Sequence, residues 1–178
     1  MSKISLPPSG LAEEVLSGMG SKPDELQLVT FSVGEPYGVP IGQVQEIIRV
    51  GSITKVPNSI PCMEGVINLR GRVLPLLNLR KRLKMPDREI TKESRIVVVE
   101  AAKKSIGLLV DAVSQVIKVS SEVIEKAPEE VLEADSDYIT GVCKLQKGLV
   151  ILLDLEKLLR RESMELTDEG SDTGKAKK

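Results

Sequence analysis

The stretch GVINLRGRVLPLLNLRKRL, residues 65–83, decides how this chain folds. Its Val, Ile and Leu residues are typical of a buried strand, but Asn68, Arg70 and Gly71 interrupt them. Because glycine readily adopts the positive φ of a tight turn, we interpret the interruption as the tip of a β-hairpin. Folding does not require a cation at a hairpin tip, so Arg70 needs a separate explanation.

The same stretch occurs a second time, as GVCKLQKGLVILLDLEKLL in residues 141–159. A preceding pair of segments also aligns without gaps, YGVPIGQVQEIIRV (37–50) with IGLLVDAVSQVIKV (106–119). The offset between the copies grows from 69 to 76 positions, so the second copy has seven extra residues between its two blocks. The chain therefore contains an internal duplication.

Each copy predicts five short strands, rich in β-branched residues and broken by Gly, Pro and Asn, followed by one helical turn. We expect strands at 26–33, 37–41, 44–50, 62–69 and 72–77, with a helical turn at 79–83. The second copy predicts strands at 95–101, 106–110, 113–119, 139–145 and 149–153, with a helix from residue 155. Five strands suffice to curl into a small barrel, so the expected fold is all-β, with two five-stranded barrels packed together and short C-terminal helical turns.

The ends of the chain differ from its repeated part. Residues 1–24 are rich in Pro and Gly and predict a flexible N-terminal tail, while the polar residues 161–178 predict a disordered C-terminal tail. Between them we expect one domain, residues 25–160, made of two intertwined barrel subdomains at approximately 25–84 and 95–160. The hairpin tips of the two copies are expected to differ in length, because Gly148 aligns one place after Gly71.

The composition excludes most catalytic classes. The 178 residues include no histidine and only two cysteines, so Ser–His and Cys–His pairs and ordinary zinc sites are impossible. No Gly-rich phosphate loop occurs either. We therefore expect no catalytic residue, no metal and no cofactor. Since no apolar run approaches the roughly 18 residues of a membrane span, and no signal peptide is visible, we also expect a cytoplasmic protein without membrane insertion.

Charge is unevenly distributed, although the net charge is only −1. Residues 65–84 carry six basic side chains and no acidic one, while residues 120–137 carry seven acidic side chains and one lysine. Two interpretations stay open at this point. The segments are either two solvated faces or a pair of complementary poles that steer docking.

Two alternative functions use these features differently. An enzyme would pair Asp111 and Asp154, but these align with Gly42 and Asn78, so turn or cap residues are the simpler interpretation. A small barrel with a basic segment could bind single-stranded nucleic acid. Such sites stack bases on aromatic rings, and none of the three aromatic residues of the chain lies in the basic segment.

The strings YGVPIGQVQEII, GVINLRGRVLPLLNL and GVCKLQKGLVILLDLEKLL, in this order and spacing, resemble CheW, the family of bacterial chemotaxis coupling proteins. The resemblance extends from about residue 26 to residue 159. It implies two five-stranded barrels like those of Src-homology-3 (SH3) domains, packed around a shared hydrophobic core. It also implies a non-catalytic adaptor between methyl-accepting chemotaxis receptors and the regulatory domain of the histidine kinase CheA, and we expect a monomer in isolation.

The resemblance also implies a binding site for the receptors and the kinase. Its residues are Val44, Glu46, Gly65, Asn68, Arg70 and Gly71. Two of them have a simpler interpretation. Val44 aligns with Val113 as a core valine would, and Gly65 aligns with Gly141, which indicates a backbone requirement common to both copies. Asn68 and Arg70 are better candidates, because the second copy has Lys144 and Gln146 there.

Overall fold

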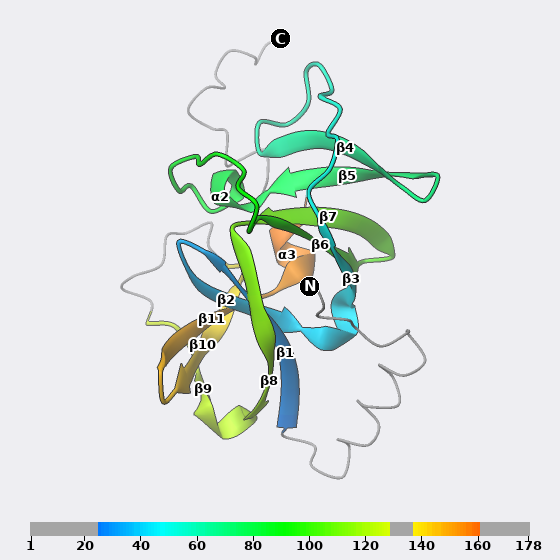
Figure 1. The fold of residues 1–178 in the computed structure, drawn as a ribbon. Coiled ribbons are helices and arrows are strands. Elements are labelled where there is room, and N and C mark those ends of the chain that lie inside the picture. The colour runs from blue at the N-terminus through cyan, green and yellow to red at the C-terminus, as the bar shows by residue number, and fades with distance from the viewer. Residues whose placement is uncertain (1–24, 129–136, 161–178) are drawn as a thin grey trace.

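The computed structural model describes residues 25–128 and 137–160, and both expected tails lie outside these ranges. Two sheets pack together, one above the other in Figure 1. The strands are β1 (Glu25–Val33), β2 (Glu35–Pro40), β3 (Val44–Arg49), β4 (Met63–Leu69), β5 (Arg72–Asn78), β6 (Arg95–Ala101), β7 (Lys104–Val110), β8 (Ala112–Ser120), β9 (Ile124–Glu125), β10 (Ile139–Leu145) and β11 (Gly148–Leu153). The helical turns are α2 (Leu79–Arg82) and α3 (Leu155–Leu158), with 3-10 turns at Ile41–Gln43 and Ser121–Val123.

The predicted elements are confirmed, and each of the ten expected strands begins and ends within two residues of its predicted bounds. The short strand β9 was not expected. It lies in the longer connection of the second copy and pairs with β10. The first copy has a single bridge at the corresponding place, between Thr54 and Val66.

Each sheet combines strands from both copies of the repeat. The order in one sheet is β8-β1-β2-β11-β10-β9, and in the other it is β3-β6-β7-β5-β4. Apart from β9, the two orders are identical once each strand is replaced by its counterpart in the other copy. Each copy therefore contributes its first two strands to the sheet that contains the last three strands of the other. Neither sheet coincides with residues 25–84 or 95–160, because the chain passes from one sheet to the other before β3 and passes back before β8.

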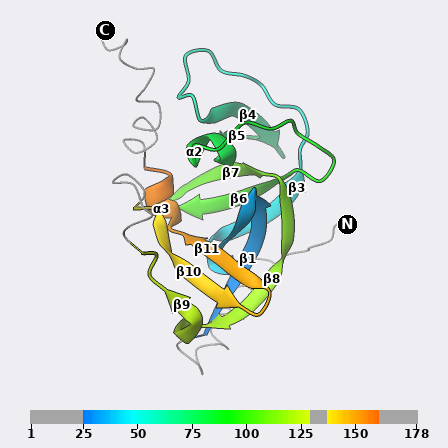
Figure 2. The same cartoon turned by 90° about the vertical axis from the view of Figure 1, so that its left-hand side faces the viewer.

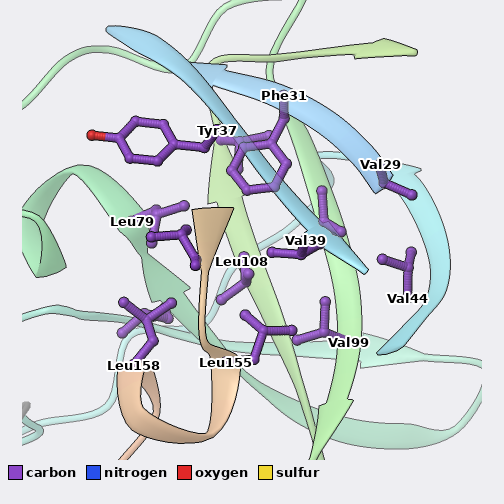
Figure 3. Packing of buried hydrophobic residues seen from close by; sticks show 14 of the residues in the cluster. Val29, Phe31, Tyr37, Val39, Val44, Leu79, Val99, Leu108, Leu155 and Leu158 are labelled. Carbon is purple, nitrogen blue, oxygen red and sulfur yellow. The ribbon is translucent and has the colours of Figure 1, made fainter. Parts of the chain in front are cut away.

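A hydrophobic core shared by both sheets occupies the centre of the molecule (Figure 3). Successive residues of β1 explain how one strand serves two layers. Val29 and Phe31 point into the shared core, whereas Leu28 packs into a smaller cluster inside its own sheet with Val150 and Leu152. Because each fully buried side chain of this size stabilises the fold by about 1.5–3 kcal/mol, β1 links the two layers strongly.

The two helical turns lie where the sheets meet, and α3 is at this junction in both views (Figures 1 and 2). The side chain of Asn78 accepts a hydrogen bond of 3.2 Å from the backbone N–H of Lys81 and so caps α2. Asp154 caps α3 in the same way, at 3.2 Å from the N–H of Lys157. This confirms the interpretation of Asp154 as a cap, since short polar side chains satisfy the free N–H groups at a helix start.

Candidate functional site

The β4–β5 tip, residues 68–71, is the centre of the candidate site. Leu69 and Arg72 form the last pair of the hairpin, so Arg70 and Gly71 make a two-residue turn. Their φ angles are +52° and +86°, as in the type I′ turn that matches the twist of a hairpin. The side chain of Asn68 accepts a hydrogen bond of 2.9 Å from the N–H of Gly71. Asn68 and Gly71 therefore fix the shape of the turn, and the predicted positive φ of Gly71 is confirmed.

Arg70 forms an ion pair with Glu46, which lies 24 positions earlier on β3. β3 and β4 are the two edge strands of the sheet, so this contact joins one edge strand to the turn that follows the other. The guanidinium side chain stays 70% exposed, whereas the glutamate is 28% exposed. An ion pair this open to solvent contributes at most about 1 kcal/mol to stability. Instead, the ion pair holds the exposed arginine side chain in one orientation toward the solvent.

A row of polar side chains, absent from the predicted site, continues from Glu46 across the neighbouring strands. Gln45 donates a hydrogen bond of 3.0 Å to Glu100 on β6 and accepts one of 3.1 Å from the hydroxyl of Ser105 on β7. A register shift in β3 between Val44 and Glu46 leaves Gln45 as the extra residue of a bulge. Only the Val-Gln-Glu string could have indicated Gln45, and nothing in the sequence connects it with Ser105.

Two predicted site residues support the fold from within. Val44 is buried, and Figure 3 shows its side chain directed into the shared core near Val29 and Val99. Gly65 has a φ of +150°, and a Cβ atom there would collide with the carbonyl oxygen of Thr54. At the equivalent Gly141, a Cβ atom would lie 2.6 Å from the carbonyl oxygen of Glu125. The simpler interpretations of Val44 and Gly65 are thereby confirmed.

The second barrel lacks this ion pair, because its equivalent residues are Gln115 and Gln146. A groove of about 510 Å³ opens there instead, lined in part by Gln115 and the β10–β11 hairpin. The predicted difference in tip length is wrong. Leu145 pairs with Gly148, so this turn also has two residues, and the tips differ in conformation because the positive φ falls on Gly148, after the turn. The exposed arginine is thus a property of the first copy alone.

The basic side chains of residues 65–84 form neither a uniformly solvated face nor a uniform docking pole. Arg82 is 1% exposed, and Arg80 forms an ion pair of 2.8 Å with Asp111. Lys81 lies 3.6 Å from Glu64. Burial would raise the pKa of Glu64, but the hydrogen bond from Asn78 and the charges of Lys81 and Lys55 outweigh it and lower the pKa. With the pair of Arg70 and Glu46, at least four of the six basic side chains are therefore engaged within the fold. Residues 129–136 of the acidic segment lie outside the described ranges.

A family model for the CheW-like domain matches residues 27–163. The chain belongs to the CheW family. Chemotaxis protein CheW of Bacillus subtilis is 36% identical over 144 residues, which cover 81% of this chain and 92% of that one. Chemotaxis protein CheW of Klebsiella aerogenes is 34% identical, with 80% of this chain and 86% of that one covered. The crystal structure of the scaffolding protein TtCheW from Thermoanaerobacter tengcongensis superimposes with a TM-score of 0.70 at 37% identity, covering 76% of this chain and 92% of that one.

Membership of the CheW family makes the chain a non-catalytic chemotaxis scaffold, and the nucleic-acid alternative finds no support. The two carboxylates of the enzyme hypothesis have structural roles. Asp154 caps α3, and Asp111 accepts hydrogen bonds from both Arg80 and the N–H of Gly34. Burial would raise the pKa of Asp111, but these hydrogen bonds and the charges of Arg80 and Arg88 outweigh it and lower the pKa. Asp111 is therefore an ionised anchor rather than an acid–base group.

Two further observations concern ligands and membranes. Within the described residues of this CheW-family chain, no three His, Cys, Asp or Glu side chains gather as a metal site would require. Cys62 and Cys143 are both buried and belong to different hydrophobic clusters. Across residues 25–128 and 137–160, no helix is long and apolar enough to cross a membrane.

Proposed function

We propose that this protein couples methyl-accepting chemotaxis receptors to the regulatory domain of the histidine kinase CheA, as a monomeric adaptor in the cytoplasm. Its membership of the CheW family supports this role, since the family is one of chemotaxis scaffolds. Neither nucleic acid nor insertion into the membrane is part of the proposal. The adaptor needs only surfaces that recognise two proteins, and the fold offers a set of exposed hairpin tips for that purpose.

The proposed contact surface is Glu46, Asn68 and Arg70, with Val44, Gly65 and Gly71 maintaining its shape. The observation that carries this assignment is the ion pair between Arg70 and Glu46, formed at an exposed position of one barrel and absent from its sister. An arginine held in place loses less conformational entropy when it binds a partner carboxylate, and its planar fork can bind that group in a bidentate manner. Arginine is also common among the residues that dominate binding at interfaces.

The exposed apolar residue next to the tip strengthens the assignment. Val73 follows Arg72 on β5, and its side chain is 68% exposed. It lies three residues after Arg70, and interfaces combine apolar and arginine side chains at their centres. The sister barrel exposes Leu149 at the equivalent position but lacks the ion pair. The two barrels therefore differ in the charged group that each offers to a partner, because only the first has the arginine.

The proposal is tested by mixing the purified protein with the kinase regulatory domain and a soluble receptor-tip fragment. We expect one complex that contains all three components, and binary complexes of the protein with each partner. A protein that binds only one of the two partners would not be a coupler. Adding a single-stranded oligonucleotide at physiological salt gives the test of the alternative, and no binding is expected.

A further inference from the structure

The bulge in β3 places an exposed glutamine directly before the glutamate of the ion pair. Gln45 is the extra residue between Val44 and Glu46, where the register of β3 with β6 shifts. A bulge redirects the side chains beside it, so its geometry determines where Glu46 points. The carboxylate of Glu46 in turn holds the exposed guanidinium of Arg70. The orientation of Arg70 therefore depends on how firmly the bulge is held.

The side chain of Gln45 is held by two residues of the neighbouring strands (Figure 1). Its Nε2 group donates a hydrogen bond of 3.0 Å to Glu100 on β6, and its Oε1 atom accepts one of 3.1 Å from the hydroxyl of Ser105 on β7. Glu100 and Ser105 are themselves direct partners in the β6–β7 register. Both ends of the amide are thus fixed on one cross-strand pair. We call these three residues the clamp: Gln45, Glu100 and Ser105.

The sister barrel has an equivalent bulge but holds it in a different way. There Ser114 and Gln115 lie opposite the single residue Thr30, where the register of β8 with β1 shifts. The hydroxyl of Thr30 donates a hydrogen bond of 2.7 Å to the carbonyl oxygen of Gln115 and accepts one of 3.2 Å from its N–H. The first barrel has Val98 at this position, and valine cannot form such bonds. The first barrel therefore holds its bulge through the clamp instead.

The clamp occurs in the same copy as the ion pair. Its equivalents in the sister barrel are Ser114, Ser32 and Pro36. Ser32 and Pro36 are direct partners in the β1–β2 register, as Glu100 and Ser105 are in the β6–β7 register. This sister pair offers neither a carboxylate nor, at proline, a hydroxyl, so it cannot hold an amide in the same way. A groove of about 510 Å³ opens there, lined in part by Pro36 and Ser114. Clamp and ion pair are thus present together in one barrel and missing together from the other.

We propose that Gln45 is a positioning residue of the contact surface. The clamp fixes the bulge, the bulge directs Glu46 toward Arg70, and the ion pair presents the guanidinium to the partner. This rests on the proposed function, because it assigns the clamp to recognition by Arg70. The hydrogen bonds of the clamp are exposed and add little to stability. Their effect is on binding, since an arginine that is already ordered in the free protein loses less conformational entropy when it binds.

NMR relaxation of arginine side-chain nitrogens in the free protein tests the first step. The Nε–H group of Arg70 reports the order of its guanidinium, and the exposed Arg72 is the reference. We expect Gln45→Met, which keeps the length of the side chain but removes both polar atoms, to lower the order of Arg70 toward that of Arg72. Glu100→Gln keeps an acceptor for the Gln45 amide and should leave the order of Arg70 unchanged. The same result is expected for Ser114→Ala, the matched control in the sister barrel.

A double-mutant cycle on partner binding tests the second step. Titrations with the kinase regulatory domain and the soluble receptor-tip fragment compare Gln45→Met, Arg70→Ala and the double variant. Gln45→Met should weaken binding of the partner that Arg70 contacts by about three- to tenfold, the range for the net free energy of one ordinary hydrogen bond. In the Arg70→Ala background the same change should have no further effect, because Gln45 acts through Arg70.

Two results would overturn the proposal. In one, the order of Arg70 is the same with and without the Gln45 amide. In the other, Gln45→Met leaves binding unchanged, or weakens it equally in the presence and absence of the Arg70 side chain. A failure of the proposed function looks different, since the unmodified protein then binds neither partner. The relaxation experiment needs no partner and still decides whether the clamp orders Arg70.

Discussion

The Nε atom of Arg82 donates a hydrogen bond of 2.9 Å to the carbonyl oxygen of Leu158, and the two residues occupy the same position in the two copies of the repeat. The guanidinium also lies 4.6 Å from the centre of the Tyr138 ring. Carbonyl groups at the end of a helix lack partners within the helix, so this bond satisfies α3 with a side chain of α2. Equivalent positions of the two copies are thus in contact, and one is occupied by an arginine and the other by a leucine.

Arg82→Ala is expected to lower the free energy of unfolding by about 3–5 kcal/mol, because it leaves a cavity and deprives the Leu158 carbonyl of its donor. Arg82→Leu, which restores the residue of the sister copy, should cost less, since a well-packed apolar side chain often replaces a buried charge without loss. Urea denaturation measures both. Arg72→Ala, at an exposed position, is the matched control and should change stability by less than about 0.5 kcal/mol. Equal losses for Arg82→Ala and Arg72→Ala would contradict the buried role.

Arg70→Ala is expected to weaken binding to at least one of the two proposed partners by roughly 1–4 kcal/mol, the range for a truncated interface arginine. Thermal stability should hardly change, because the ion pair with Glu46 is exposed. Arg70→Lys should rescue binding poorly, since an ammonium group cannot reproduce the planar fork of a guanidinium. Titrations with the kinase regulatory domain and the receptor-tip fragment give the affinities.

Two further variants separate binding from folding at this tip. Arg70→Asn creates the Asn-Gly pair that type I′ turns favour, so the melting temperature should stay the same or rise while binding is lost. Gln146→Ala, at the equivalent site of the second barrel, should be milder than Arg70→Ala for both partners. If Arg70→Ala binds both partners as well as the unmodified protein does, the tip is structural only.

Asp111→Asn is expected to reduce stability by about 2–3 kcal/mol at pH 7, because it removes the anion that Arg80 and Arg88 bind. The pKa of Asp111 is lowered in the fold, so its contribution is fully present above the unfolded value of about 3.9 and is lost as the pH falls through the lower folded value. The difference between the two proteins should therefore shrink as the pH decreases below about 4. Chemical denaturation at several pH values measures it. A difference that stays constant down to pH 2 would show that the carboxylate charge is not involved.

Gly65→Ala is expected to destabilise the protein by more than about 2 kcal/mol, since the new Cβ meets backbone at a φ of +150°. Gly51→Ala is the control, because nothing lies within 4 Å of a Cβ atom there and no positive φ occurs. Thermal melting separates a structural from a binding role at Gly65. A variant that melts like the unmodified protein but binds no partner would assign Gly65 to the interface itself.

Local structure was predictable from the sequence because each local rule acts within a few residues. Runs of β-branched residues broken by Gly, Pro and Asn located the strands, and Gly71 located the hairpin tip. The short polar residues Asn78 and Asp154 preceded the two helical turns, where they act as caps. The duplication then predicted two similar units without any knowledge of their packing.

Long-range pairing was not predictable, because the duplicated strands are interchangeable by sequence. β1 could pair with β3 of its own copy or with the equivalent β8 of the other, and the hydrophobic pattern of each strand fits both. The ion pair between Arg70 and Glu46 was missed for a related reason. Each residue belonged to a different motif, and only the folded sheet brings the two motifs together.

The exchange of strands has a consequence for how the chain folds as it is synthesised. Leu28 of β1 pairs with Ile117 of β8, so the first strand leaves the ribosome long before its neighbour exists. At about 5–20 residues per second, roughly 4–18 s pass between the synthesis of these two residues. During this interval neither barrel can close, and the apolar strands of the nascent first copy remain without their partners. A duplication that exchanges its strands thus delays the closure of both barrels until strands of the second copy have been synthesised.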